Sequence, residues 1–316
     1  MKSQKILAYI CCVLRSVIYG TSILFTSNLL DNLHFMHMLS LRFLLSALAF
    51  TFMAALGLIK VNFKGKSIRL LLLTAIFEPV IYFIFEAIGI GGTTTSLAGI
   101  LAATVSIMVM IFESIFLKEK TSLAQKLLLF LSVSGVVTVT VFSGGSGGQN
   151  SILGIVFLLL ANMSGALFVI CSRKSSTTQF SAMEVTFFSA VVGAVVFNII
   201  NFFIMLSKGN LHTYFTPLLK VENIIAFVFL SFLSTILATL MNNYAISKIQ
   251  ASSVSALGAI STIVTIATGV IFKGDKISWY HIVGTVLILC GSIGINYITQ
   301  KKAAKKNAEH FPEEAK

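Results

Sequence analysis

Residues 143–150 read SGGSGGQN and form the single flexible, linker-like segment of an otherwise strongly apolar chain. Five apolar runs precede this segment and five follow it. A helix needs about 20 mostly apolar residues to cross the hydrocarbon core of a bilayer. The sequence therefore predicts ten transmembrane helices, at approximately 5–27, 36–58, 68–90, 93–117, 123–142, 152–172, 181–206, 222–247, 250–272 and 279–299.

The composition supports an all-α integral membrane protein. Of the 316 residues, 56% are hydrophobic and 11% are charged, and the mean hydropathy is +0.94. A soluble domain of this length would be about 25% charged. Because exposed backbone cannot lie in lipid, the short connections predict antiparallel helical hairpins. The four cysteines lie inside apolar runs without metal-ligand spacing, so we expect neither a metal site nor a cofactor.

The basic residues predict the orientation of the chain in the membrane. With the N-terminus inside, seventeen Lys and Arg residues fall in cytoplasmic segments and four in outer loops. This asymmetry favours a plasma (inner) membrane protein with both termini cytoplasmic. The net charge of +12 lies in short segments between apolar runs, which is not the pattern of a nucleic-acid-binding face. We expect residues 301–316 to form a charged cytoplasmic tail.

An internal repeat relates the two sides of the linker. When residues 1–142 are shifted by 156 positions onto residues 151–300, Leu101 falls on Leu257, and the turn that begins at Glu119 falls on the turn that begins at Asp275. Each half contains five predicted spans, so the second half must enter the membrane from the opposite side. The sequence therefore predicts two inverted five-helix repeats, an architecture typical of alternating-access transporters.

Three segments resemble the EamA branch of the drug/metabolite transporter superfamily. They are RFLLSAL at 42–48, IFLKEKTSLAQKLLLFLSVSGV at 115–136 and VIFKGDKISWYHIVGTVLILCGSI at 270–293, the last of which keeps the family's glycine spacing from Gly284 to Gly291. The resemblance implies a ten-helix carrier, and many carriers of this family export amino acids or other small metabolites. The family often has a proline midway along spans four and nine, whereas this chain has none at 102–106 or 258–263.

Two opposite charges are predicted at the same depth in the membrane. Arg15 and Glu78 each lie about ten residues from the cytoplasmic end of an inside-to-outside span. A mid-membrane charge costs roughly 2.5–3.5 kcal/mol, so each needs a partner or a polar cavity. The two residues are natural partners. Their pair either binds substrate or protons in a central cavity or holds the two spans together.

The segment IFEPVIYFIFEAIG, residues 76–89, carries further polar groups on one helical face. Glu78, Tyr82 and Glu86 are spaced by four residues, so they share a side that can line a cavity. Glu86 lies closer to the outer surface, so the alternative to a cavity position is a carboxylate solvated by water there. Pro79 removes a backbone donor and predicts a bend beside Glu78.

The second half carries neutral polar residues at related places. The shift of 156 places Glu78 on Ser234 and Glu86 on Asn242, and Asn162 and Asn243 add further amides. We expect a cavity that is charged on one wall and hydrogen-bonding on the other, suited to a zwitterionic or polar-aromatic metabolite.

Two other charged residues are expected near the membrane surfaces rather than in the cavity. Arg42 is expected to snorkel toward the outer surface and Glu184 to be solvated at the cytoplasmic one.

The sequence thus predicts a transporter of small polar metabolites that lies in the lipid bilayer. Protons are a candidate coupling ion. A multidrug or other metabolite carrier of the same fold is the alternative. A membrane enzyme or a structural or receptor-like membrane protein is a different class. The sequence shows no paired catalytic groups of the kind an enzyme needs, so we expect no enzymatic activity. Substrate, direction, coupling ion and oligomeric state stay open.

Overall fold

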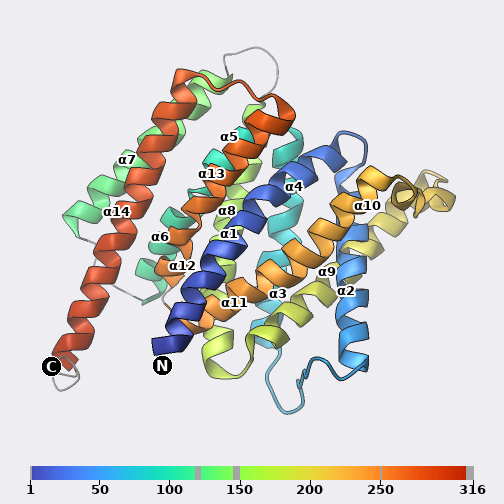
Figure 1. Ribbon diagram of the computed structural model, residues 1–316, viewed down its shortest axis with the longest axis horizontal. Helices are drawn as coiled ribbons and strands as arrows, with labels where there is room; N and C mark the ends of the chain where they lie inside the picture. The colour runs from blue at the N-terminus through green and yellow to red at the C-terminus, as the bar shows by residue number, and fades with distance from the viewer. Residues whose placement is uncertain (1, 118–121, 145–149, 250, 311–316) are drawn as a thin grey trace.

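The computed structural model describes residues 2–117, 122–144, 150–249 and 251–310, and these ranges are helical without any β-strand (Figure 1). Within them, nine helical segments are long and apolar enough to cross a membrane, and they coincide with the first nine predicted spans. The apolar part of the last predicted span, Trp279–Ile295, is shorter. Ten spans therefore stay a prediction, and most of the predicted linker, 145–149, lies outside the described residues.

The first half contains three uninterrupted helices and two interrupted ones. The uninterrupted helices are α1 (Lys2–Leu30), α2 (Phe35–Ala55) and α7 (Leu123–Gly144). The first interrupted rod consists of α3 (Arg69–Ala75), the π-helical turn η1 (Ile76–Ile81) and α4 (Tyr82–Gly91), and the second consists of α5 (Thr95–Ala102) and α6 (Val105–Leu117).

The second half repeats this plan. Its uninterrupted helices are α8 (Ile152–Thr178), α9 (Ala182–Ser207) and α14 (Trp279–His310), the last of which continues into the predicted tail. Its interrupted rods are α10 (Val221–Val228), η4 (Phe229–Ala238) and α11 (Thr239–Lys248), followed by α12 (Ala251–Leu257), α13 (Ala259–Thr268) and η5 (Gly269–Lys273). Two short 3-10 turns, η2 (Leu211–Thr213) and η3 (Thr216–Leu219), connect α9 to α10.

The helices form a broad bundle in which the two halves interlock. In Figure 1, α7 and α14 lie side by side at one flank and α2 and α9 at the other, and the contacts confirm both pairings. Between the flanks, α1 packs against α13 and α11, while α8 packs against α4 and α6. The start of α1 and the described end of α14 lie at the same edge of the molecule.

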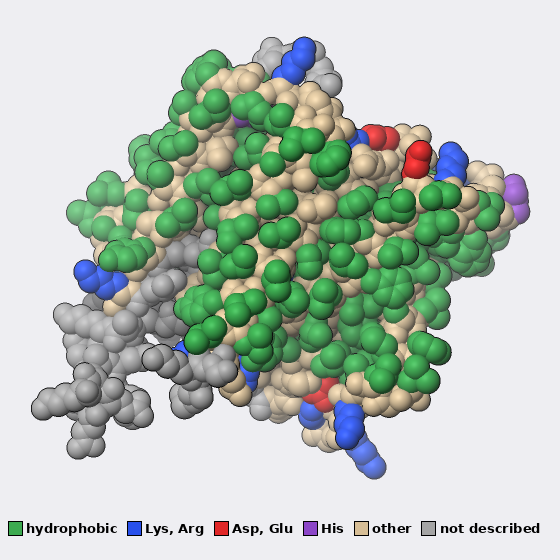
Figure 2. All heavy atoms as spheres, in the orientation of Figure 1, with side chains coloured by type: hydrophobic (Ala, Val, Ile, Leu, Met, Phe, Trp, Pro, Cys, Tyr) green, Lys and Arg blue, Asp and Glu red, His purple; other side chains and the backbone are tan. Residues whose placement is uncertain are grey.

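The outer face of the bundle has the polarity of a membrane protein. Figure 2 shows hydrophobic side chains across the middle of the visible face, with Lys, Arg, Asp and Glu toward its upper and lower margins. Many large apolar side chains are exposed on the surface of the molecule, including Phe52, Phe130 and Phe203, each more than 60% accessible. An exposed apolar surface of this extent is unfavourable in water and favourable against lipid chains.

Small residues allow α7 and α14 to approach closely. A Cβ added to Gly291 would overlap Ser132, and a Cβ added to Gly135 would lie 2.8 Å from the backbone oxygen of Gly284. The Ser132 hydroxyl also donates to the Ile288 carbonyl oxygen at 3.3 Å. The glycine spacing that carried the family resemblance therefore serves backbone-to-backbone packing of the last helix in each half.

Two helices break in mid-course although neither contains a proline. The α5–α6 rod breaks at residues 103–104, and the α12–α13 rod breaks at Gly258. The carbonyl oxygen of Leu101 accepts a hydrogen bond from Asn162 Nδ2 at 2.8 Å, and that of Leu257 accepts one from the Ser16 hydroxyl at 3.0 Å. Side chains from neighbouring helices thus satisfy backbone groups that an unbroken helix would satisfy itself.

Candidate functional site

A cavity of about 130 Å³ lies between the two halves of the molecule. Its walls come from α1, the η1–α4 segment, the α5–α6 break and α8, and from α11 and the α12–α13 break. The apolar lining includes Ile23, Phe83, Phe168 and Val169. The charged and larger polar lining residues are Arg15, Tyr19, Glu78, Tyr82, Glu86 and Asn242.

Five of the eight residues predicted from the sequence line this one cavity. They are Arg15, Glu78, Tyr82, Glu86 and Asn242. Four of them come from the first half, and Asn242 comes from the second. The structure therefore assembles a polar site from parts of the chain more than 150 residues apart.

The other three predicted residues do not line this cavity. Asn162 is bonded to Leu101 O and to the hydroxyl of Thr104 at the α5–α6 break. Asn243 uses both ends of its amide: Oδ1 accepts from Ser172 at 2.7 Å, and Nδ2 donates to Thr186 at 2.9 Å.

Ser234 lies behind the cavity wall, where its hydroxyl accepts from Arg42 Nη2 at 3.1 Å. The side chains of Asn162, Asn243 and Ser234 therefore hold helices together, and the structure does not bring them to the cavity surface.

The backbone around Glu78 explains how this carboxylate reaches the cavity. Glu78 has extended dihedral angles, φ −143° and ψ 117°, inside an otherwise helical rod. Proline sterically disfavours helical geometry in the residue before it, so Pro79 accounts for the interruption. The Phe77 carbonyl oxygen accepts the Tyr82 backbone N–H and, in addition, a hydrogen bond from the Ser164 hydroxyl at 2.8 Å. The bend that the sequence predicted lies here, and it places Glu78 in the cavity wall.

Arg15 and Glu78 line the same cavity but do not form the predicted ion pair. Arg15 Nη2 donates to the Val254 carbonyl oxygen at 2.6 Å, and its Nε is buried without a hydrogen-bond partner. Glu78 makes no hydrogen bond or ion pair with any residue in the described parts of the chain. The pairing expected from equal depth is absent, and both groups keep unused hydrogen-bonding capacity.

Glu86 belongs to the cavity rather than to the outer surface. Its Oε1 accepts a hydrogen bond from the Tyr82 hydroxyl at 2.8 Å, one helical turn away on the same face. The Tyr82 ring lies 3.1 Å from the position that a Cβ on Gly165 would occupy, so the absence of a side chain there gives the ring its space. Tyr82 thereby orients one oxygen of Glu86.

Arg42 is a functional candidate that sequence reasoning misplaced. The side chain was expected to snorkel, but the residue is only 2% exposed. Its Nε donates to the Thr235 hydroxyl at 2.9 Å, and its guanidinium carbon lies 4.4 Å from the centre of the Phe83 ring. Arg42 interacts electrostatically with Glu86 across this wall. The hydroxyl-rich sequence of η4 was the signal that could have revealed its partners.

Tyr19 was also missed. It lines the cavity, and its hydroxyl is hydrogen-bonded to the Thr239 hydroxyl at 3.1 Å. The guanidinium carbon of Arg15 lies 5.9 Å from the centre of the Tyr19 ring. Because Tyr19 follows Arg15 by four residues, helical spacing alone could have placed both on one face.

Glu184 is buried rather than solvated as expected. Its carboxylate bonds Lys66 Nζ at 2.8 Å, accepts the Asn62 backbone N–H and forms a capping box with Ser181 at the start of α9. The buried carboxylate is tolerated because three different donors satisfy it. This cluster ties the loop between α2 and α3 to the second half.

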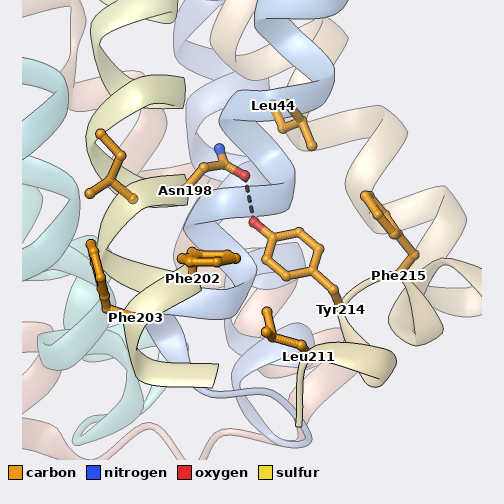
Figure 3. Close-up of a pocket in the computed structure, with 8 residues that line it drawn as sticks. Leu44, Asn198, Phe202, Phe203, Leu211, Tyr214 and Phe215 are labelled. Carbon is orange, nitrogen blue, oxygen red and sulfur yellow. Dashed lines mark hydrogen bonds between the residues drawn. The ribbon is translucent and has the colours of Figure 1, made fainter. Parts of the chain in front are cut away.

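A larger but shallower groove lies on the outside of the bundle between α2, α9 and the η2 turn (Figure 3). It has a volume of about 700 Å³, and none of its eight described lining residues is charged. Figure 3 shows the Tyr214 hydroxyl pointing to Asn198, whose Oδ1 accepts its hydrogen bond. Asn198 Nδ2 donates to the Ser40 and Ala194 carbonyl oxygens. Because the Asn198 amide is fully hydrogen-bonded, it offers a ligand in this groove no unsatisfied polar group of the kind found in the central cavity.

Comparisons with known proteins agree on one family. The model of the EamA-like transporter family matches this chain twice, at residues 6–141 and 152–297. An uncharacterized transporter of Bacillus subtilis (strain 168), YcxC, is 33% identical over 305 residues, which cover 96% of this chain and 97% of that protein. An uncharacterized transporter of Clostridium kluyveri is 24% identical over 253 residues, covering 77% of this chain and 76% of that one.

A solved crystal structure of a protein resembles the whole chain. It covers 95% of this chain and 99% of its own, with a TM-score of 0.61 and 12% sequence identity. At this identity the likeness concerns the fold alone.

Proposed function

The chain belongs to the EamA-like transporter family and is a multi-pass membrane transporter, and from this premise we propose that it exports amino acids or related small polar metabolites by alternating access. The observation that carries the proposal is the central cavity, in which Arg15, Glu78 and Glu86 from one half face Asn242 from the other. Charged side chains at membrane depth are costly, and they mark transport pathways when they surround a cavity.

The proposal includes two inverted repeats, residues 1–142 and 151–300, joined by the linker 143–150 and followed by the cytoplasmic tail 301–316. Helix packing supports it, because exchanging the halves preserves the main contacts. α7 packs on its own counterpart α14, and α2 on its counterpart α9. The packing of α4 on α8 corresponds to that of α11 and η4 on α1. The breaks after Leu101 and Leu257 also correspond.

The dimensions of the cavity favour a small solute over a large drug. Its volume of about 130 Å³ is well below the roughly 300–1,000 Å³ typical of pockets for drug-sized ligands. A zwitterion fits the charged lining, since Arg15 offers a positive group and Glu78 a negative one. These features favour a metabolite carrier over the multidrug alternative.

The proposed orientation and coupling follow from charge. The excess of Lys and Arg in alternate loops supports cytoplasmic termini in the plasma (inner) membrane. The outward direction of transport rests on the family resemblance alone. Glu78 has no bonded partner among the described residues, so it is free to exchange a proton as well as to contact substrate. We therefore include proton coupling through Glu78 in the proposed mechanism.

Flux through purified protein in liposomes tests the proposal. Vesicles are loaded with one unlabelled amino acid, and counterflow of the labelled amino acid is measured with and without a pH gradient. We expect flux above that of protein-free vesicles, and we expect Glu78→Gln to reduce it at least tenfold. Glu222→Gln, which removes an exposed carboxylate from the start of α10, is the matched control and should leave flux unchanged. Equal flux in the Glu78→Gln and unaltered proteins would refute the role of the cavity.

A further inference from the structure

We propose that the cavity recognises an ammonium group of its substrate, through the carboxylate of Glu78 and the amide oxygen of Asn242, and that Asn242 determines which substrate charge is accepted. This inference rests on the proposed transport function and specifies the substrate class of the same cavity. Solutes with a primary ammonium group, amino acids above all, form that class.

The amide oxygen of Asn242 is the first observation. Asn242 is 5% exposed and lines the cavity, and its Oδ1 is buried without a hydrogen-bond partner. The neighbouring Asn243 bonds protein groups at both ends of its amide. A buried polar atom without a partner is unfavourable, and few such atoms persist in folded proteins. Because Asn242 lines the cavity, a substrate donor that draws this buried amide oxygen toward itself would give it the partner it lacks.

The two carboxylates give the second observation. Glu78 has no hydrogen bond within the described residues, and Glu86 has one, from Tyr82. Together with Asn242 Oδ1 they make the cavity rich in unsatisfied acceptors. An ammonium group carries three donors and a positive charge, so it can both hydrogen-bond the unpaired acceptors of this wall and attract its carboxylates. Charge attraction is stronger in a cavity lined by protein than in bulk water.

The aromatic lining adds to the preference for a cation. Tyr19, Tyr82 and Phe168 line the cavity beside these acceptors. Cations are attracted to the faces of aromatic rings, and the attraction grows when water is excluded. The rings therefore support an ammonium group without competing for its hydrogen bonds.

Arg15 would contact the other end of the substrate, its carboxylate. Its Nη2 is occupied by the Val254 carbonyl oxygen, while its Nε is buried without a partner. An unpaired donor on a cation favours a carboxylate. The site thus has an acceptor region for an ammonium group and a donor for a carboxylate.

The charge balance predicts which substrates fit. When both carboxyl groups are ionised, Glu78 and Glu86 offset Arg15 and Arg42, and the four groups in and beside the cavity carry no net charge. A zwitterion preserves this balance, whereas a solute with a second positive charge does not. Replacing the neutral Asn242 by a carboxylate would make room for that second charge.

Substrate trios test the recognition of the ammonium group. Leucine, phenylalanine, serine and threonine are each compared with the hydroxy acid and the amine that carry the same side chain, by thermal stabilisation of the purified protein and by counterflow. We expect at least one amino acid to bind at least tenfold more tightly than its hydroxy acid. Hydroxy acids or sugars that bind as well as the amino acids would overturn this inference and leave metabolite transport intact. Failure of every solute, sugars included, to bind or move would overturn both.

Variants of Asn242 test the selectivity. Asn242→Asp should raise the affinity for lysine relative to leucine at least tenfold, and Asn242→Leu should weaken binding of every amino acid that binds. Asn210→Asp, which makes the same charge change at an exposed position in the turn after α9, should leave the ratio unchanged. If Asn242→Asp does not fold, Asn242→Gln, which keeps an acceptor, is compared with Asn242→Leu and should bind more tightly. An unchanged lysine-to-leucine ratio in a folded Asn242→Asp protein, or equal binding by the Gln and Leu variants, would overturn the role of Asn242.

Discussion

Leu101 and Leu257 are separated by 156 residues, and each presents its carbonyl oxygen at a helix break to a polar side chain of another helix. Asn162 of α8 bonds the first and Ser16 of α1 bonds the second. The two halves therefore build the same broken helix with different side chains.

Removing these donors should destabilise the protein. Asn162→Leu removes one donor from the Leu101 carbonyl oxygen, which still accepts from the backbone N–H and the hydroxyl of Thr104, so the loss should be that of one hydrogen bond, about 0.5–1.5 kcal/mol. Ser16→Ala removes the side-chain donor to the Leu257 carbonyl oxygen and should cost a similar amount. Chemical denaturation in detergent measures both. Ser134→Ala, which removes a bond made only within α7, is the control. Stability equal to that of the unaltered protein would show that the breaks do not depend on these donors.

Arg15 and Glu78 should behave as two separate groups of one cavity. Because no ion pair joins them, a double-mutant cycle of Arg15→Gln and Glu78→Gln should give a coupling free energy below about 1 kcal/mol, whereas breaking a fully buried pair costs about 3–5 kcal/mol. Each single variant should lose transport, and the double variant should not recover it. A large coupling energy with recovery of transport would instead support a structural pair.

Arg42 should be essential to the wall between α2 and η4. Its guanidinium forms two hydrogen bonds that the ammonium group of lysine cannot reproduce in the same geometry. Arg42→Gln should therefore lower the free energy of unfolding, and Arg42→Lys should lower it as well. Thr235→Val removes one bond to a charged donor and should cost about 1.5–3 kcal/mol. Unfolding free energies measure the loss, with Thr213→Val, at an exposed turn, as the control. Rescue by Arg42→Lys would show that charge alone suffices.

The start of α2 should lose stability in acid. His34 Nδ1 accepts the Met36 backbone N–H, which requires this nitrogen to be unprotonated. Partial burial, then the positive charges of Lys208 and His37, lower the pKa of His34 below its ordinary value. The folded state therefore disfavours the proton, and stability should fall as the pH drops from the ordinary histidine pKa toward the lowered one.

His34→Asn tests this dependence, because asparagine caps a helix without titrating. Hydrogen exchange at residues 35–38, followed from pH 7.5 to 5, should accelerate beyond its intrinsic pH dependence in the unaltered protein and not in the variant. The same acid response in both proteins would assign it to another group.

The helices were predictable because span length and hydropathy are local properties. The shared face of Glu78, Tyr82 and Glu86 followed from helical spacing, and Asn242 followed from the repeat. Arg42 was misplaced because its partners lie about 190 residues away in the sequence, and the hydroxyl-rich η4 segment that contains them does not by itself indicate which helix it faces. Asn162 and Asn243 look like cavity residues in the sequence, since nothing local reveals that protein groups already satisfy their amides.

The glycine contacts between α7 and α14 limit how the two halves can move. Gly135 faces the backbone of Gly284, and Gly291 faces Ser132, so the two helices lie too close together for a larger side chain at these glycine positions. Axial sliding would bring the neighbouring larger side chains into collision, whereas a small change in crossing angle keeps the glycines in contact. In the proposed alternating-access cycle, we therefore expect the two halves to pivot about this seam rather than to slide along it.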